Sequence, residues 1–166
     1  MKSEDLKALQ EPLKNRYKTN PGAALVTLKA SSKTGENITC KIETGKNMIE
    51  AGLHPATGGD GLSICSGDML LESLAACAGV TLKAVATAID FDLQEGVVSV
   101  EGDLDFRGTL AVEKTASVGF KDIRMTFTIK TNESTERIQS LVKLTERYCV
   151  VLQTLSRANQ VSLSIS

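Results

Sequence analysis

Cysteine offers the richest chemistry in this chain, and two of its four cysteines lie in apolar stretches that predict buried helices. These two are Cys77 and Cys149. A cysteine on a buried helix is usually an inert part of the core. Two of them on helices that pack together could instead form a dithiol that is oxidised to a disulfide. We interpret Cys40, in a predicted strand, and Cys65, in a predicted loop, as structural.

The single histidine, His54, lies in a loop at 54–61 that holds a proline and three glycines. It is therefore the one base available to a Cys–His nucleophile, and it is not on a helix beside either buried thiol. A zinc site from His54, Cys65, Cys77 and Cys149 would lack the short spacings typical of zinc ligands. The glycines match no phosphate-binding motif, and no G-x-S-x-G motif is present. We expect no metal and no cofactor.

The overall composition excludes several classes of function. The 166 residues include 19 Lys and Arg against 20 Asp and Glu, for a net charge of −1. This balance does not favour a nucleic-acid or membrane-surface protein. Only 4% of residues are aromatic and none is Trp, which disfavours base-stacking platforms. The start of the chain is charged, and the apolar stretch between Glu72 and Lys83 is too short to span about 30 Å of hydrocarbon. We expect a cytoplasmic protein.

Periodicity predicts the elements that must position these residues. Apolar residues at spacings of three and four predict helices, and strict alternation predicts strands. The predicted order is α-βββ-α-ββ-α-β in one α+β domain spanning 1–166. The helices are expected at 4–17, 68–89 and 131–155, and the strands at 24–30, 38–42, 47–53, 98–106, 123–130 and 161–165. The helix at 68–89 is apolar on nearly all sides. One small sheet cannot cover it, so we expect a second copy to do so in a homodimer.

Two stretches resemble the cysteine motifs of the OsmC/Ohr family, the osmotically inducible protein C and organic hydroperoxide resistance proteins. They are Asp68-Met69-Leu70-Leu71-Glu72-Ser73-Leu74-Ala75-Ala76-Cys77 and Glu146-Arg147-Tyr148-Cys149-Val150-Val151-Leu152-Gln153-Thr154-Leu155. The resemblance extends from about Ala24 onward and leaves residues 1–20 as an N-terminal helical extension. It implies an OsmC-like fold, in which antiparallel sheets cover two central helices of an intertwined homodimer.

The resemblance also implies a thiol-dependent peroxidase that reduces organic hydroperoxides. Cys77 would be the attacking thiolate and Cys149 the resolving thiol, and a lipoyl or thioredoxin-like dithiol would reduce their disulfide. Lowering a thiol pKa by about two units gains only about threefold in rate, because a more acidic thiolate is a weaker nucleophile. A cation must therefore stabilise the leaving oxygen. The family uses an arginine oriented by a carboxylate.

The candidates for that arginine are Arg16, which we prefer because the family's arginine lies near the N-terminus, and Arg107 and Arg147. The candidate carboxylates are Asp68 and Glu72. On one straight helix, Asp68 lies opposite Cys77 and Glu72 lies about 140° away from it. A break in the helix, or a role toward a partner subunit, would be required.

Val150 follows Cys149 where the family often has proline. An apolar setting of this kind predicts a raised thiol pKa. The alternative function is a non-catalytic dimer of the same fold that binds a hydrophobic small molecule, with the cysteines structural.

Overall fold

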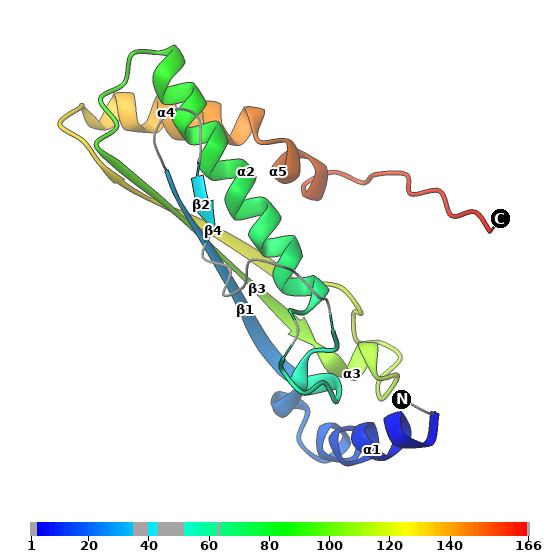
Figure 1. The fold of residues 1–166 in the computed structure, drawn as a ribbon. Helices are drawn as coiled ribbons and strands as arrows, with labels where there is room; N and C mark the ends of the chain where they lie inside the picture. The colour runs from blue at the N-terminus through cyan, green and yellow to red at the C-terminus, as the bar shows by residue number, and fades with distance from the viewer. Residues whose placement is uncertain (1–2, 35–39, 43–51, 63, 166) are drawn as a thin grey trace. The chain divides into compact units, whose positions relative to one another are not determined.

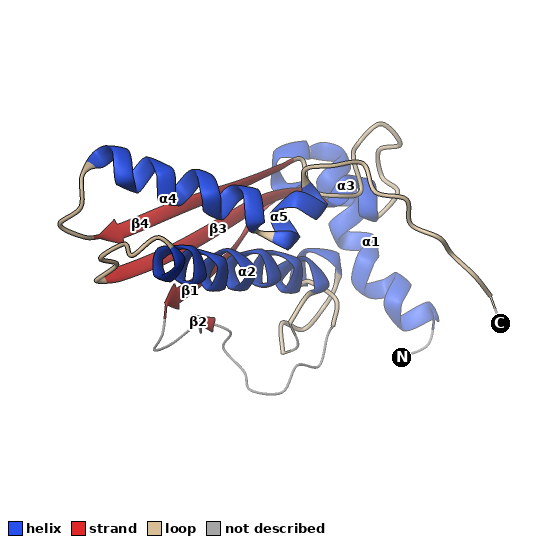
Figure 2. Cartoon of the chain, turned by 90° about the horizontal axis from the view of Figure 1, so that it is seen from above, coloured by secondary structure: helices blue, strands red, loops and turns tan. Residues whose placement is uncertain are grey.

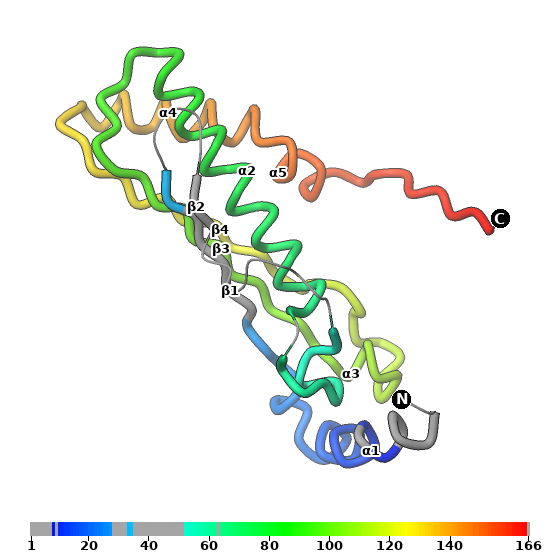
Figure 3. Tube along the Cα trace, in the orientation of Figure 1, coloured from blue at the N-terminus to red at the C-terminus, as the bar shows by residue number. Residues whose placement is uncertain are grey.

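The computed structural model describes residues 3–34, 40–42, 52–62 and 64–165 (Figure 1). The chain runs through these elements in order, and Figure 3 follows the same path as a Cα trace. They are α1 (Ser3–Thr19), η1 (Pro21–Ala24), β1 (Leu25–Thr34), β2 (Cys40–Ile42), η2 (Pro55–Thr57), α2 (Ser66–Ala88), β3 (Glu95–Asp105), α3 (Phe106–Thr109), β4 (Asp122–Lys130), α4 (Thr135–Tyr148) and α5 (Val150–Leu155).

The strands form one four-stranded sheet in the order β2-β1-β3-β4, and β1 and β2 pair antiparallel (Figure 2). Burial alternates along β3, where Val98, Val100 and Leu104 are buried while Ser99, Glu101 and Asp103 are partly exposed. This alternation places one face of the strand in the core. The predicted α+β fold with an antiparallel sheet is confirmed.

The chain divides into two compact units. The first comprises Met1–Ala30, Glu43–Glu72 and Ser99–Thr126, and the second comprises Ser31–Ile42, Ser73–Val98 and Phe127–Ser166. Each unit therefore draws on three separate segments of the sequence. The interpretation of the chain as a single domain stays a prediction.

In the first unit, α1 holds the short turn η2. The hydroxyl of Tyr17 donates a 2.6 Å hydrogen bond to the carbonyl of Ala56, and the side-chain amide of Gln10 donates to the carbonyl of Thr57 at 3.2 Å. Tyr17 is only 2% exposed. The predicted helix at 4–17 is confirmed, and its apolar stripe ends in a side chain that binds a distant loop.

In the second unit, the later part of α2 packs tightly on β3. A Cβ on Gly96 would lie 2.9 Å from a methyl carbon of Leu82, so the glycine permits the close approach of strand and helix. Beyond the end of α2, the guanidinium of Arg137 donates to the carbonyls of Ile89 and Asp90. It also lies 5.7 Å from the centre of the Phe91 ring. These contacts attach the start of α4 to the end of α2.

Two predicted elements are wrong, and one cannot be compared. The helix expected at 131–155 breaks at Cys149, whose ψ of 105° is extended, and becomes α4 and α5. The strand expected at 161–165 does not form. Val161 is 80% exposed and Leu163 is 93% exposed, and no strand in the described part of the chain pairs with this segment. An extended segment becomes a strand only with a neighbour to bond to. Most of the strand predicted at 47–53 lies outside the described residues.

Helix α2 has the length and mean hydropathy, 1.5 over its most apolar window, of a helix that could cross a membrane. The core helix of a soluble protein passes the same test, and 44% of that window is buried within this chain. Length and composition alone therefore do not decide between the two kinds of helix.

Candidate functional site

The thiols of Cys77 and Cys149 are within hydrogen-bonding reach of each other in the second unit. Cys77 lies on α2 and is half-buried, whereas Cys149 is completely buried. Both are free thiols. The structure therefore brings together the two cysteines that the sequence singled out, from helices far apart in the chain.

Cys149 occupies the break between α4 and α5. Its backbone N–H donates to the carbonyl of Thr145 and ends α4, and its own carbonyl accepts from Gln153 to begin α5. Cys149 is the N-cap residue of α5 through its backbone, and its side chain makes no capping hydrogen bond. No proline or glycine is needed for this break.

Burial and contact with Cys77 together raise the pKa of the Cys149 thiol to about 11, although the nearby backbone amides of Leu152 and Val151 lower it. At neutral pH Cys149 therefore keeps its proton. The raised pKa predicted from the apolar setting is confirmed. The two sulfurs also differ in environment, because Cys149 is completely buried whereas Cys77 is half-buried.

The other candidate residues do not lie in the same unit as the thiols. Arg16 is exposed on α1, and Asp68 and Glu72 lie at the start of α2, all within the first unit. Burial raises the pKa of Glu72, and the nearby charge of Asp68 raises it further. Helix α2 is continuous from Ser66 to Ala88, so it contains no break that would turn either carboxylate toward Cys77.

The two other candidate arginines already have partners. The guanidinium of Arg107 forms a bidentate ion pair with Asp105, with contacts of 3.0 Å and 2.5 Å. The guanidinium of Arg147 lies 5.4 Å from the centre of the Tyr148 ring. Of the three arginines, Arg16 has no ion pair or side-chain hydrogen bond to another described residue.

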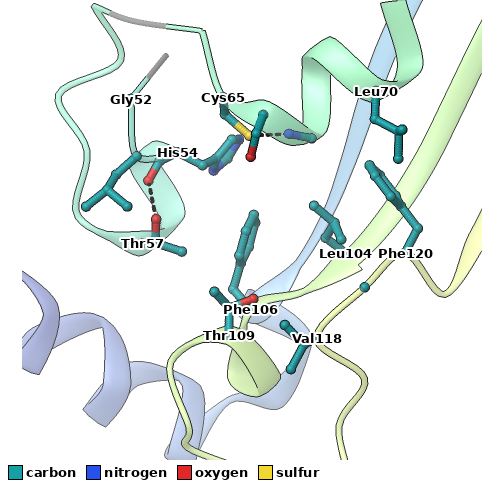
Figure 4. A pocket seen from close by; sticks show the side chains of 14 residues that line it. Gly52, His54, Thr57, Cys65, Leu70, Leu104, Phe106, Thr109, Val118 and Phe120 are labelled. Carbon is teal, nitrogen blue, oxygen red and sulfur yellow. Dashed lines mark hydrogen bonds between the residues drawn. The ribbon is translucent and has the colours of Figure 1, made fainter. Parts of the chain in front are cut away.

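The first unit contains a separate cavity of about 350 Å³ that includes His54 and Cys65 in its lining (Figure 4). The sequence interpretation missed this pairing, because it treated the histidine loop as a connection and Cys65 as structural. The available signal was a cysteine placed immediately before the long helix that follows the loop. Among the described residues, no group of three or more His, Cys, Asp or Glu side chains could hold a metal ion.

Comparison with known proteins identifies relatives of this chain. The model of the OsmC-like protein family matches residues 58–164, a range that includes both cysteine stretches. A solved OsmC-like hydroperoxide resistance protein from Jannaschia sp. CCS1 is 17% identical with a TM-score of 0.58, covering 83% of this chain and 91% of its own. A solved OsmC-like protein from Mycoplasma pneumoniae is 17% identical with a TM-score of 0.55, covering 80% and 85%. No curated protein sequence matches the chain.

Proposed function

The chain belongs to the OsmC-like protein family, and on that premise we propose that it is a thiol-dependent peroxidase that reduces organic hydroperoxides. The observation that carries this proposal is the contact between Cys77 and Cys149, in which Cys149 is the protonated partner. A peroxidase of this kind needs one thiol that attacks and a second thiol close enough to form a disulfide with it.

In the first step, the Cys77 thiolate attacks the terminal oxygen of the hydroperoxide. A sulfur–oxygen bond forms as the O–O bond breaks, and the electron pair leaves with the alkoxide, which takes up a proton to become the alcohol. Sulfur is oxidised and the peroxide is reduced, and Cys77 becomes a sulfenic acid. The hydrogen bond from Cys149 orients the attacking sulfur before this step.

In the second step, the sulfur of Cys149 attacks the sulfur of the Cys77 sulfenic acid. The disulfide forms as the S–O bond breaks, and the proton of Cys149 leaves with the hydroxyl as water. Once Cys77 is oxidised, its negative charge no longer raises the pKa of Cys149, so this resolving thiol ionises more readily than in the resting pair. A lipoyl or thioredoxin-like dithiol then reduces the disulfide by exchange.

We assign the cation for the leaving oxygen to Arg16, with Asp68 and Glu72 as its orienting carboxylates. Two observations support this assignment: Arg107 is bound to Asp105, and Arg16 has no ion pair to another described residue. Because α2 is unbroken, the proposal requires these groups to act on the thiols of a partner subunit. Arg16→Gln should lower kcat/KM for cumene hydroperoxide by about 10²-fold. Lys18, a nearby exposed cation, provides the control. Lys18→Gln should change kcat/KM for cumene hydroperoxide less than twofold.

The proposed enzyme is a homodimer. The support is the exposed apolar alternation of Val161, Leu163 and Ile165, which needs a neighbouring strand and has none in the described part of the chain. A chain that ends at Ala158 should sediment as a monomer where the full chain sediments as a dimer. Equal sedimentation coefficients for the two chains would contradict this role of the segment.

The decisive experiment follows free thiols after mixing reduced protein with cumene hydroperoxide. The proposal expects rapid loss of two thiols per chain and a Cys77–Cys149 disulfide in the peptide map. Cys77→Ser should abolish the loss, and Cys149→Ser should leave a sulfenic acid that dimedone traps. Cys65→Ser is the matched control and should still form the disulfide. If millimolar peroxide leaves the thiols unchanged, the protein is not a peroxidase.

A further inference from the structure

The cavity of the first unit has the size and lining of a small-molecule site. Its volume of about 350 Å³ is at the lower end of the range for ligand pockets, about 300–1,000 Å³. Most of its lining is apolar and includes Leu70, Leu104, Phe106 and Phe120. Figure 4 shows these side chains around the open space, with the imidazole of His54 extending toward Cys65.

His54 presents a single hydrogen-bond donor to this cavity. Its Nδ1 accepts a 3.0 Å hydrogen bond from the backbone N–H of Ala56, so in the neutral ring the proton is on Nε2. The ring stacks on Phe106, with centroids 4.9 Å apart, which fixes its plane. Among the described residues, none accepts a hydrogen bond from Nε2. Burial lowers the pKa of His54 more than the nearby Asp68 charge raises it, which favours the neutral ring at neutral pH.

The sulfur and the carbonyl of Cys65, which also lines the cavity, already have partners. The sulfur of Cys65 accepts from the backbone N–H of Gly67 at 3.2 Å, and the carbonyl of Cys65 accepts from Met69. The first of these bonds occupies the Gly67 amide, one of the amides at the start of α2 that an anion would otherwise bind. None of the described residues that line the cavity is Lys, Arg, Asp or Glu. A charged ligand would therefore lose its hydration without gaining an opposite charge.

The turn that carries His54 is held in place from two sides. Tyr17 and Gln10 of α1 bind the carbonyls of Ala56 and Thr57, and the Thr57 hydroxyl donates to the carbonyl of His54 at 2.9 Å. The N-terminal helix thus fixes the donor relative to the apolar wall. A donor fixed in advance loses little freedom when it binds a ligand.

We propose that this cavity binds an uncharged molecule with an apolar body and one acceptor oxygen, such as an aryl ketone. The oxygen accepts from Nε2 of His54, and the body packs against Leu104, Phe106 and Phe120. This site contains neither of the reactive thiols of the proposed peroxidase reaction, since both lie in the other unit. The Cys77→Ser protein should therefore bind the ketone as the unmodified protein does.

The test uses the full chain and three probes of one shape: 2-acetonaphthone, 2-ethylnaphthalene without the oxygen, and 2-naphthoate with a charge. Binding is followed by the methyl chemical shifts of Leu104 and Val118. The ketone should bind about tenfold more tightly than the hydrocarbon, because the hydrocarbon covers the half-buried donor without giving it a partner. The naphthoate should not bind measurably at pH 7.5. Equal affinity of the ketone and the naphthoate would overturn the proposal.

Two variants locate the bound ketone. His54→Asn keeps an acceptor for the Ala56 amide but loses Nε2. It should weaken the binding of the ketone about tenfold and change the affinity for the hydrocarbon less. Thr109→Phe fills part of the cavity and should weaken the binding of the ketone and of the hydrocarbon by at least tenfold each. Thr126→Phe makes the same exchange at an exposed position outside the lining and should leave both affinities within twofold. An unchanged ketone affinity in Thr109→Phe would place the binding elsewhere and overturn the proposal.

Discussion

The thiol of Cys149 lies within hydrogen-bonding reach of that of Cys77, and burial together with this neighbour raises its pKa to about 11. The two sulfurs are similar in chemistry but different in environment. Cys77 is half-buried on a continuous helix, and Cys149 is buried at a break between two helices. This asymmetry gives each thiol a distinct role and leads to the first two predictions.

Iodoacetamide should label Cys77 at least tenfold faster than Cys149 at pH 8. With a pKa of about 11, only about 0.1% of Cys149 is thiolate at that pH, and its sulfur is also shielded from solvent. Peptide mass spectrometry after timed quenching measures both rates. In Cys77→Ser, the charge that raises the pKa of Cys149 is absent, so the labelling of Cys149 should accelerate. Equal labelling of the two cysteines in the unmodified chain would contradict the asymmetry.

Stability should fall as the pH rises above 9. The folded pKa of Cys149 is raised from 9.0 to about 11, so the folded state holds the proton more tightly than the unfolded chain does. This contribution to stability is fully present below pH 9 and is lost between about pH 9 and 11. The loss should be on the order of 2 kcal/mol. Urea unfolding at pH 7.5, 9 and 10.5 measures it, and Cys149→Ala should show a distinctly smaller dependence over this range.

Tyr17→Phe should reduce the free energy of unfolding by about 1–3 kcal/mol. The change removes the 2.6 Å hydrogen bond to Ala56 and leaves that carbonyl without its donor. Tyr148→Phe is the matched control, because Tyr148 is 54% exposed, and it should change stability by less than about 0.5 kcal/mol. Chemical denaturation of the three proteins makes the comparison. If the two variants are equally stable, α1 does not anchor the turn through this bond.

Gly108→Ala should destabilise the protein by about 1–3 kcal/mol, because its Cβ would lie 2.5 Å from the carbonyl oxygen of Ser117 and the backbone there would have to move. The matched control is Gly119→Ala in the loop that follows α3, where a Cβ meets nothing within 4 Å. Thermal unfolding of both variants measures the difference. If the Gly108→Ala protein is as stable as the Gly119→Ala protein, the backbone near Ser117 moves aside at little cost in free energy.

Local pattern accounts for most of the secondary structure. The stripe of apolar residues predicts α1, and the alternation in 123–130 predicts β4, because each depends only on side chains close together in sequence. The same logic failed at 161–165, where the alternation is clear but a strand needs hydrogen bonds from another segment. It also failed at Cys149, where the backbone is extended and the helix breaks without the proline or glycine that usually marks a break.

The sequence by itself determined the fold class, the family resemblance and the choice of Cys77 and Cys149, because these depend on local periodicity and on motifs that are contiguous in the chain. Only the tertiary structure decided that the two thiols meet, that Cys149 is the protonated partner, and that His54 and Cys65 line one cavity. Contact between distant segments and the burial that shifts a pKa arise from packing, which no local pattern of residues encodes.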